Sequence, residues 1–200
     1  MRKKLLGASL LVILLSVAAY GTWAYFTTEA RTTNVITTGT IDITLNETTT
    51  GGVAFPKKGI SGVMPGQSVD KLVTVENEGD SPAWIRVGVF SQIEAADGSE
   101  LPLSLGDAGD VLSFDINTEH WTDGEDGYFY YLSPVQAGET TEQLFSKVTF
   151  NAAMTNDYQN CTAYVDVAAQ AVQIKHNGSS ALEAEGWPAL ESDAPVDPVE

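Results

Sequence analysis

Residues 40–45, Thr-Ile-Asp-Ile-Thr-Leu, alternate strictly between polar and apolar side chains. In an extended chain the two isoleucines and the leucine share one face, while the threonines and the aspartate share the other. This period of two is typical of a β-strand that buries one face. The stretch around it, residues 27–50, contains 11 threonines among 24 residues, and β-branched threonine favours strands.

Similar short runs recur along the chain, separated by turn signals such as Met64–Gln67, which contains Pro-Gly, and Asn77–Pro82. The other predicted strands are 73–75, 85–89, 112–116, 128–132, 144–150 and 161–175. No run has the period of a convincing amphipathic helix, and only residues 151–160 leave room for a short one. We therefore predict an all-β fold, an antiparallel jelly-roll-like or Ig-like β-sandwich of about seven or eight strands.

Two of these runs carry apolar side chains on both faces. In residues 128–131, Tyr-Phe-Tyr-Tyr, both faces are aromatic, which favours a central strand of the sandwich over an exposed sugar-stacking platform. In residues 161–175 the odd-numbered valines and alanines form one apolar phase, whereas Val172 and Ile174 belong to the other. That change of phase predicts a β-bulge or a change of edge.

Residues 1–24 have the layout of a secretory signal peptide, with three basic residues before an apolar run at 5–19. Signal peptidases need small side chains at positions −1 and −3, and Ala24 and Thr22 meet this need. We therefore place the cleavage site between Ala24 and Tyr25. A transmembrane anchor is the weaker alternative, because the apolar run is shorter than the ~20 residues that span a bilayer.

The full chain has a formal net charge of −17, from 27 acidic and 10 basic side chains. Removing residues 1–24 leaves 27 acidic and 7 basic side chains, and therefore a mature charge of −20. Because a chain this acidic has no broad basic surface, we expect no nucleic-acid partner and no membrane attachment after cleavage. Six acids and no base fall within residues 183–200, so we predict a β-sandwich domain at 25–180 and a disordered acidic tail at 181–200.

The sequence contains no recognisable catalytic motif. Its two histidines, His120 and His176, do not form the His-Glu-x-x-His pair of many zinc proteases. The single cysteine, Cys161, cannot form a disulfide within the chain, and we expect it to be a small buried residue, with a reactive thiol or an intermolecular disulfide as alternatives. We predict no catalytic, metal-binding or cofactor-binding residue. Acidic loops such as 123–127 are expected to be solubilising, and a loop calcium site is the alternative.

Four segments carry a family resemblance: Gly21–Phe26 at the signal junction, Thr38–Ile43, Met64–Ser68 and Val73–Gly79. In this order and spacing they resemble the TasA/camelysin family of exported proteins from Gram-positive bacteria. The later stretch from Gly127 to Phe145 is similar to clostridial-type members, although Ala137 stands where those members have the proline of Pro-Gly-Glu-Thr. The resemblance covers roughly residues 1–175.

This resemblance implies a jelly-roll-like β-sandwich, cleavage by a dedicated SipW-type signal peptidase, and a location outside the cell, at the cell surface or in the biofilm matrix. In the best-known branch of the family it implies fibres, in which each subunit donates an N-terminal strand to a groove of the next. The partners would then be further copies of the chain or related matrix subunits.

Residues 25–36, freed by cleavage, fit the role of a donated strand because they are rich in threonine and lack proline and glycine. The donor residues that we expect are Tyr25, Phe26, Thr27, Thr28, Ala30, Val35 and Ile36. Head-to-tail donation does not close on itself and therefore yields a filament. The alternative is that this segment pairs within its own domain.

Two other functions stay open beside a structural matrix protein. One is a cell-surface binding or adhesion module that does not polymerise. The other is a surface metallopeptidase, as camelysin-type members are described, which the missing zinc motif disfavours. The expectation is therefore a secreted structural protein rather than an enzyme.

Overall fold

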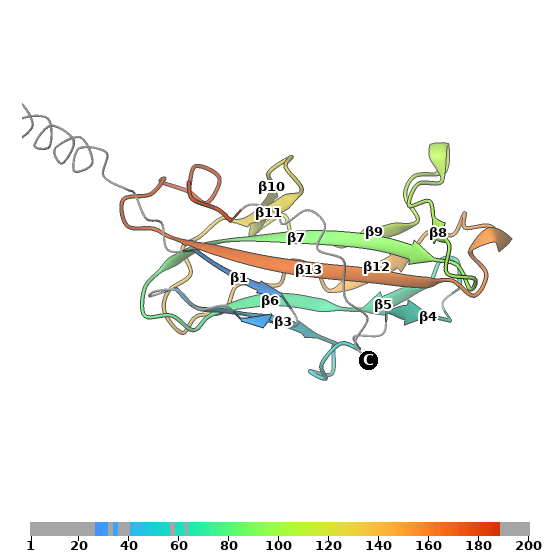
Figure 1. The fold of residues 1–200 in the computed structure, drawn as a ribbon, viewed down its shortest axis with the longest axis horizontal. Helices are drawn as coiled ribbons and strands as arrows, with labels where there is room; N and C mark the ends of the chain where they lie inside the picture. Colours follow the sequence, from blue (N-terminus) through green and yellow to red (C-terminus); the bar gives the residue numbers. More distant parts are fainter. Residues whose placement is uncertain (1–26, 32–33, 36–40, 57–58, 63, 189–200) are drawn as a thin grey trace, which may run out of the picture.

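The computed structural model describes residues 27–31, 34–35, 41–56, 59–62 and 64–188. Within these ranges the chain forms thirteen β-strands, two short 3-10 helices, Gly106–Ala108 (η1) and Asn156–Tyr158 (η2), and no α-helix. The strands pair antiparallel and stack in sandwich-like layers (Figure 1), which confirms the predicted fold class. The strands outnumber the prediction because several are only two or three residues long and too short to show an alternation.

The larger sheet is built around the two longest strands, β7 (Ala83–Glu94) and β13 (Thr162–Gln173), which run side by side (Figure 1). Its order is β10-β11-β7-β13-β1-β2, with β4 also on β13 and β8 also on β7. The short members are β10 (Trp121–Asp123), β11 (Tyr128–Tyr131), β1 (Thr27–Arg31), β2 (Asn34–Val35), β4 (Ile60–Ser61) and β8 (Glu100–Leu101).

The opposing layer contains two smaller sheets. One pairs β3 (Ile43–Thr48) with β6 (Leu72–Asn77), and the other places β12 (Lys147–Phe150) between β5 (Ser68–Asp70) and β9 (Leu112–Phe114). The chain before β12 also runs along β6, since the Thr141 N–H donates to the Val75 carbonyl at 2.8 Å. Lys71, between β5 and β6, is buried and forms an ion pair with Glu47 of β3, which ties the two sheets together.

The hydrophobic core lies between the two layers. Its largest fully buried apolar side chains are Trp121, Phe145, Phe150, Ile41, Ile43, Ile85, Ile93 and Leu144. On the aromatic strand β11, Phe129 and Tyr131 pack into this core, while Tyr128 and Tyr130 lie on the outer face of the sheet. Both outer tyrosines are buried, so β11 is a doubly covered strand, as predicted, and offers no exposed sugar-stacking platform.

The predicted bulge in residues 161–175 is wrong. β13 pairs with β7 without interruption over all twelve residues, from Thr162 opposite Glu94 to Gln173 opposite Ala83. The change of phase marks a strand that is buried on both faces. Its odd-numbered residues from 163 to 171 pack into the core, whereas Val172 packs with Trp84 on the outer face.

The C-terminal segment covers that outer face. Ala181 and Ala184 are buried in one cluster with Trp84 and the outer tyrosines, and Trp187 packs against this cluster. Packing on this face continues past residue 180, the predicted end of the domain, to Trp187. The cause is that two alanines and a tryptophan stand among the acids and supply apolar contacts. Residues 189–200 of the predicted tail lie outside the described residues.

Within the described ranges, no helix is both long enough and apolar enough to cross a membrane. The predicted signal peptide at 1–24 lies outside these ranges.

Candidate functional site

The predicted donor segment lies partly inside the described structure. Thr27, Thr28 and Ala30 belong to β1 and Val35 belongs to β2, whereas Ala24, Tyr25, Phe26 and Ile36 lie outside the described residues. β1 pairs antiparallel with β13 of the same chain, from Thr27 opposite Val172 to Arg31 opposite Ala168. In the single chain, β1 therefore pairs within its own domain, between β13 and β2, which is the alternative that the sequence left open.

The edge of β13 that receives β1 is only partly used. β7 covers the opposite edge over all twelve residues. On this edge, β1 covers residues 168–172 and β4 covers residues 162–163. Residues 164–167 have no ladder partner on this edge within the described ranges. β13 thus presents backbone groups to which a strand adds by main-chain hydrogen bonds.

A row of residues crosses the larger sheet at the level of β1. In backbone register, Glu29 of β1 lies opposite Gln170 of β13, and Gln170 lies opposite Arg86 of β7. Arg86 in turn lies opposite Tyr130 of β11. Because residues directly opposite one another share a face of the sheet, four neighbouring strands contribute one position each to this row.

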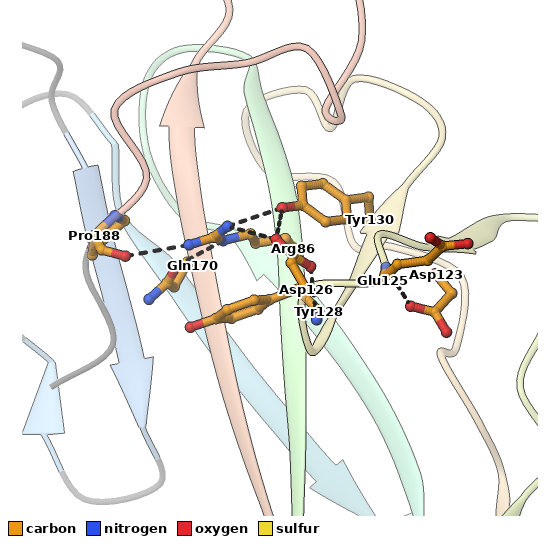
Figure 2. Close-up of polar contacts among 8 residues, drawn as sticks. All are labelled: Arg86, Asp123, Glu125, Asp126, Tyr128, Tyr130, Gln170 and Pro188. Atoms are coloured by element: carbon orange, nitrogen blue, oxygen red, sulfur yellow. Dashed lines mark hydrogen bonds and ion pairs between the residues drawn. The ribbon is translucent and has the colours of Figure 1, made fainter. Parts of the chain in front are cut away.

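Arg86 is the polar centre of the row and is 7% exposed. Its Nε–H donates to Gln170 Oε1 at 2.8 Å (Figure 2). Its two terminal nitrogens donate to the Tyr130 hydroxyl at 2.9 Å and to the Pro188 carbonyl at 3.2 Å. One side chain of β7 thereby joins β13, β11 and the C-terminal segment.

The positive charge of Arg86 is compensated by Asp126 and by aromatic rings. An oxygen of Asp126 lies 3.5 Å from Arg86 Nη1, and the Tyr130 hydroxyl donates to the same oxygen at 2.6 Å. The guanidinium carbon lies 3.9 Å from the ring centre of Tyr128 and 4.7 Å from that of Trp187. Cation–π contacts of this kind offset part of the hydration that a buried cation loses.

Gln170 is completely buried, and Arg86 fixes the orientation of its amide. An arginine has only donors, so the atom that faces Arg86 must be the amide oxygen, which leaves the nitrogen for another partner. Within the described residues, Gln170 Nε2 has no hydrogen-bond partner. A buried donor without an acceptor costs about 1–3 kcal/mol. On β13, the row therefore contains a buried donor, Gln170 Nε2, that has no acceptor among the described residues.

The same surroundings change the acidity of Tyr130. Burial raises the pKa of its phenol above the ordinary value, and the hydrogen bond to Asp126 raises this pKa further, while Arg86 acts in the opposite direction. The neutral hydroxyl, which both accepts from Arg86 and donates to Asp126, is therefore the form that the fold favours.

The acidic loop before β11 uses its carboxylates for its own turns (Figure 2). Asp123 accepts from the backbone N–H of Glu125 at 2.8 Å, and Asp126 accepts from that of Tyr128 at 3.1 Å. A calcium ion at this loop, the alternative to the predicted solubilising role, stays untested.

The histidines do not come together. His120 stacks against Tyr131, with ring centres 6.4 Å apart, and His176 is exposed in the turn after β13. Among the residues that the structure describes, no group of three or more His, Cys, Asp or Glu side chains could hold a metal ion. Since a protein zinc site needs at least three such ligands, the described residues do not fit a catalytic zinc.

Cys161 is a free, buried cysteine at the start of β13, as predicted. Burial raises the pKa of its thiol, which keeps the sulfur in the poorly nucleophilic form. It lines a cavity of about 330 Å³ together with Met64 and Met154.

Sequence reasoning missed both Arg86 and Gln170. The available signal was that each is a polar residue inside an otherwise apolar run, Trp84–Val89 for Arg86 and Val167–Val172 for Gln170. A polar residue at such a position is either exposed or buried with partners, and the sequence does not distinguish the two cases.

Comparison with known proteins gives one family match. A family model described as camelysin metallo-endopeptidase matches residues 1–97. No curated protein and no solved structure matches the chain. The match extends through β7, and it confirms over this range the resemblance that the sequence segments carry.

The neutral Tyr130 hydroxyl predicts a specific loss of stability at alkaline pH. Because its pKa is raised in the folded protein, the stability that it contributes is complete below the unfolded pKa, about 10, and falls as the pH rises through the folded pKa. Tyr130→Phe should lower the free energy of unfolding by about 1 kcal/mol at neutral pH and should flatten this alkaline decline. Urea unfolding over a pH series measures both effects.

The matched control for Tyr130→Phe is Tyr164→Phe, at a half-buried tyrosine of β13. It should leave the alkaline decline unchanged. An identical decline in the wild-type and Tyr130→Phe proteins would contradict the role assigned to the Tyr130 hydroxyl.

Proposed function

We propose, from the match of residues 1–97 to the camelysin family model, that the mature protein is a secreted structural subunit of the extracellular matrix. It assembles head to tail, by passing its N-terminal strand to the β13 edge of the next copy. The subunits lie at the cell surface or in the biofilm matrix, after a signal peptidase has cut between Ala24 and Tyr25.

The observation that supports this proposal is the way in which β1 joins the domain. β1 is an edge addition that pairs with β13 over five residues and is followed by the two-residue β2. It begins at Thr27, directly after the predicted cleavage site. An identical strand from a second copy would make identical main-chain bonds with β13, so exchange between copies keeps these contacts.

A stretch of β13 that has no ladder partner among the described residues adds to this argument. Residues 164–167 lie between the parts of the edge that β1 and β4 cover. Exposed strand edges are sites at which further chains add. A longer donated strand has room to continue along this stretch.

Disulfide trapping tests strand exchange. In the mature chain with Cys161→Ala, we introduce Ala30→Cys and Ala169→Cys, which lie directly opposite each other between β1 and β13. Strand donation predicts that oxidation under assembly conditions yields a ladder of covalent multimers on a denaturing gel. The cross-link should form only after the predicted signal peptide has been removed.

The matched control moves one cysteine by a single residue, to Glu29→Cys with Ala169→Cys. A shift of one residue places the two side chains on opposite faces of the sheet, so this pair should not cross-link. If the Ala30–Ala169 pair gives only a monomer closed within its own chain, under conditions in which the protein is assembled, strand donation is refuted.

The family description names a second candidate, a metallo-endopeptidase. The described residues offer no zinc ligand set, so we expect the purified mature protein to leave casein intact, both with added zinc and with a chelator. Casein cleavage that a chelator abolishes and zinc restores would establish the peptidase and overturn the purely structural role. A mock preparation from host cells that do not express the protein, made in the same way, controls for contaminating proteases.

A further inference from the structure

We propose that Gln170 determines the register of the strand that docks on β13, by donating its free amide N–H to a carboxylate at the position of Glu29. This inference rests on the proposed function, because it concerns the same edge of β13. It adds the chemical feature by which that edge recognises the incoming strand. Gln170 is the specificity-determining residue, and Arg86 positions it.

The N-terminal segment needs a residue that fixes its register, because the rest of its sequence distinguishes poorly between alternative registers. Residues 27–38 contain three Thr-Thr pairs. Strands with polar residues on both faces slip easily between registers. Between Tyr25 and Ile41, the only charged residues are Glu29 and Arg31.

The acceptor that Gln170 lacks lies on the β1 side. Arg86 occupies the amide oxygen from the β7 side at 2.8 Å. In Figure 2 the amide nitrogen of Gln170 points away from Arg86, and β1 is the neighbour of β13 on that side. The position opposite Gln170 on β1 is Glu29. A carboxylate accepts a hydrogen bond more strongly than a neutral oxygen does, and it is attracted by the nearby charge of Arg86.

The alternative registers offer Gln170 a poorer partner. A slip by two residues keeps the same face outward but changes the residue opposite Gln170. One direction brings Arg31, which has only donors and carries the same charge as Arg86. The other direction brings Thr27, whose neutral hydroxyl is the weaker acceptor. In the backbone register seen for β1, position 29 lies opposite Gln170.

Two cysteine pairs in the mature Cys161→Ala chain report the register. Ala30→Cys with Ala169→Cys reports the register seen here, and Ala30→Cys with Val167→Cys reports the slip that brings Thr27 opposite Gln170. Both partner positions on β13 are buried in the core, so the two reporters sit in similar surroundings. The ratio of the two cross-linking yields is the measured quantity.

Replacing the carboxylate should shift this ratio toward the slipped register. Glu29→Leu leaves the Gln170 donor unmet in the register seen here, whereas the slipped register still offers it the Thr27 hydroxyl, and we expect the ratio to fall about five- to thirty-fold. Glu29→Gln keeps an acceptor oxygen but loses the charge, and its ratio should fall between those of the wild type and Glu29→Leu. Thr27→Leu, two residues away on the same face, is the matched control and should not lower the ratio.

The decisive comparison uses Gln170→Leu, which removes the donor. In this background Glu29→Leu should no longer change the ratio, because the interaction that it disrupts is absent. A ratio that is insensitive to Glu29→Leu, or an effect of equal size in both backgrounds, would overturn the proposal. Whether each cross-link joins two chains or closes within one reports separately on strand donation, so the two proposals fail in distinguishable ways.

Discussion

The uninterrupted twelve-residue ladder between β7 and β13 holds the larger sheet together and positions the strands that add to it. Both strands are buried on both faces over one half of the ladder, Ala83–Gly88 of β7 and Val167–Val172 of β13, since the core lies on one side and the C-terminal segment lies on the other. A strand covered in this way holds its register firmly, because a slip by one residue would exchange its two buried faces. The other edge of β13 is thereby presented in a fixed position, and that edge is where β1 adds.

Arg86 connects this ladder to β11, to the loop before it and to the C-terminal segment on the outer face. Burial of a cation is costly unless its donors are used and its charge is balanced. Here the donors reach Gln170, Tyr130 and the Pro188 carbonyl, and Asp126 and the aromatic rings balance the charge. The same contacts hold the C-terminal segment on the sheet and hold the Gln170 amide in one orientation. The Arg86 side chain therefore contributes both to the stability of the outer face and to the proposed recognition of a strand at the β13 edge.

The sequence predicted those parts of the fold that a period of two encodes. The alternation at residues 40–45 located β3, and the aromatic run at 128–131 located β11 with buried side chains on both faces. The sequence did not predict burial that is caused by a segment distant along the chain. The phase change near Val172 was interpreted as a bulge, because the covering alanines and Trp187 lie in an acidic stretch that charge alone assigns to a tail. The Arg86 row could not be predicted, because it depends on the register of four strands that are distant in sequence.

Three findings support a subunit that exchanges its N-terminal strand: the family match over residues 1–97, the pairing of β1 with β13, and the stretch of that β13 edge without a ladder partner among the described residues. Negative-stain electron microscopy tests this most directly, on the purified mature chain beside the same chain lacking residues 25–33. Strand donation predicts fibres from the mature chain and none from the shortened chain. Fibres of the same width from the shortened chain would contradict it.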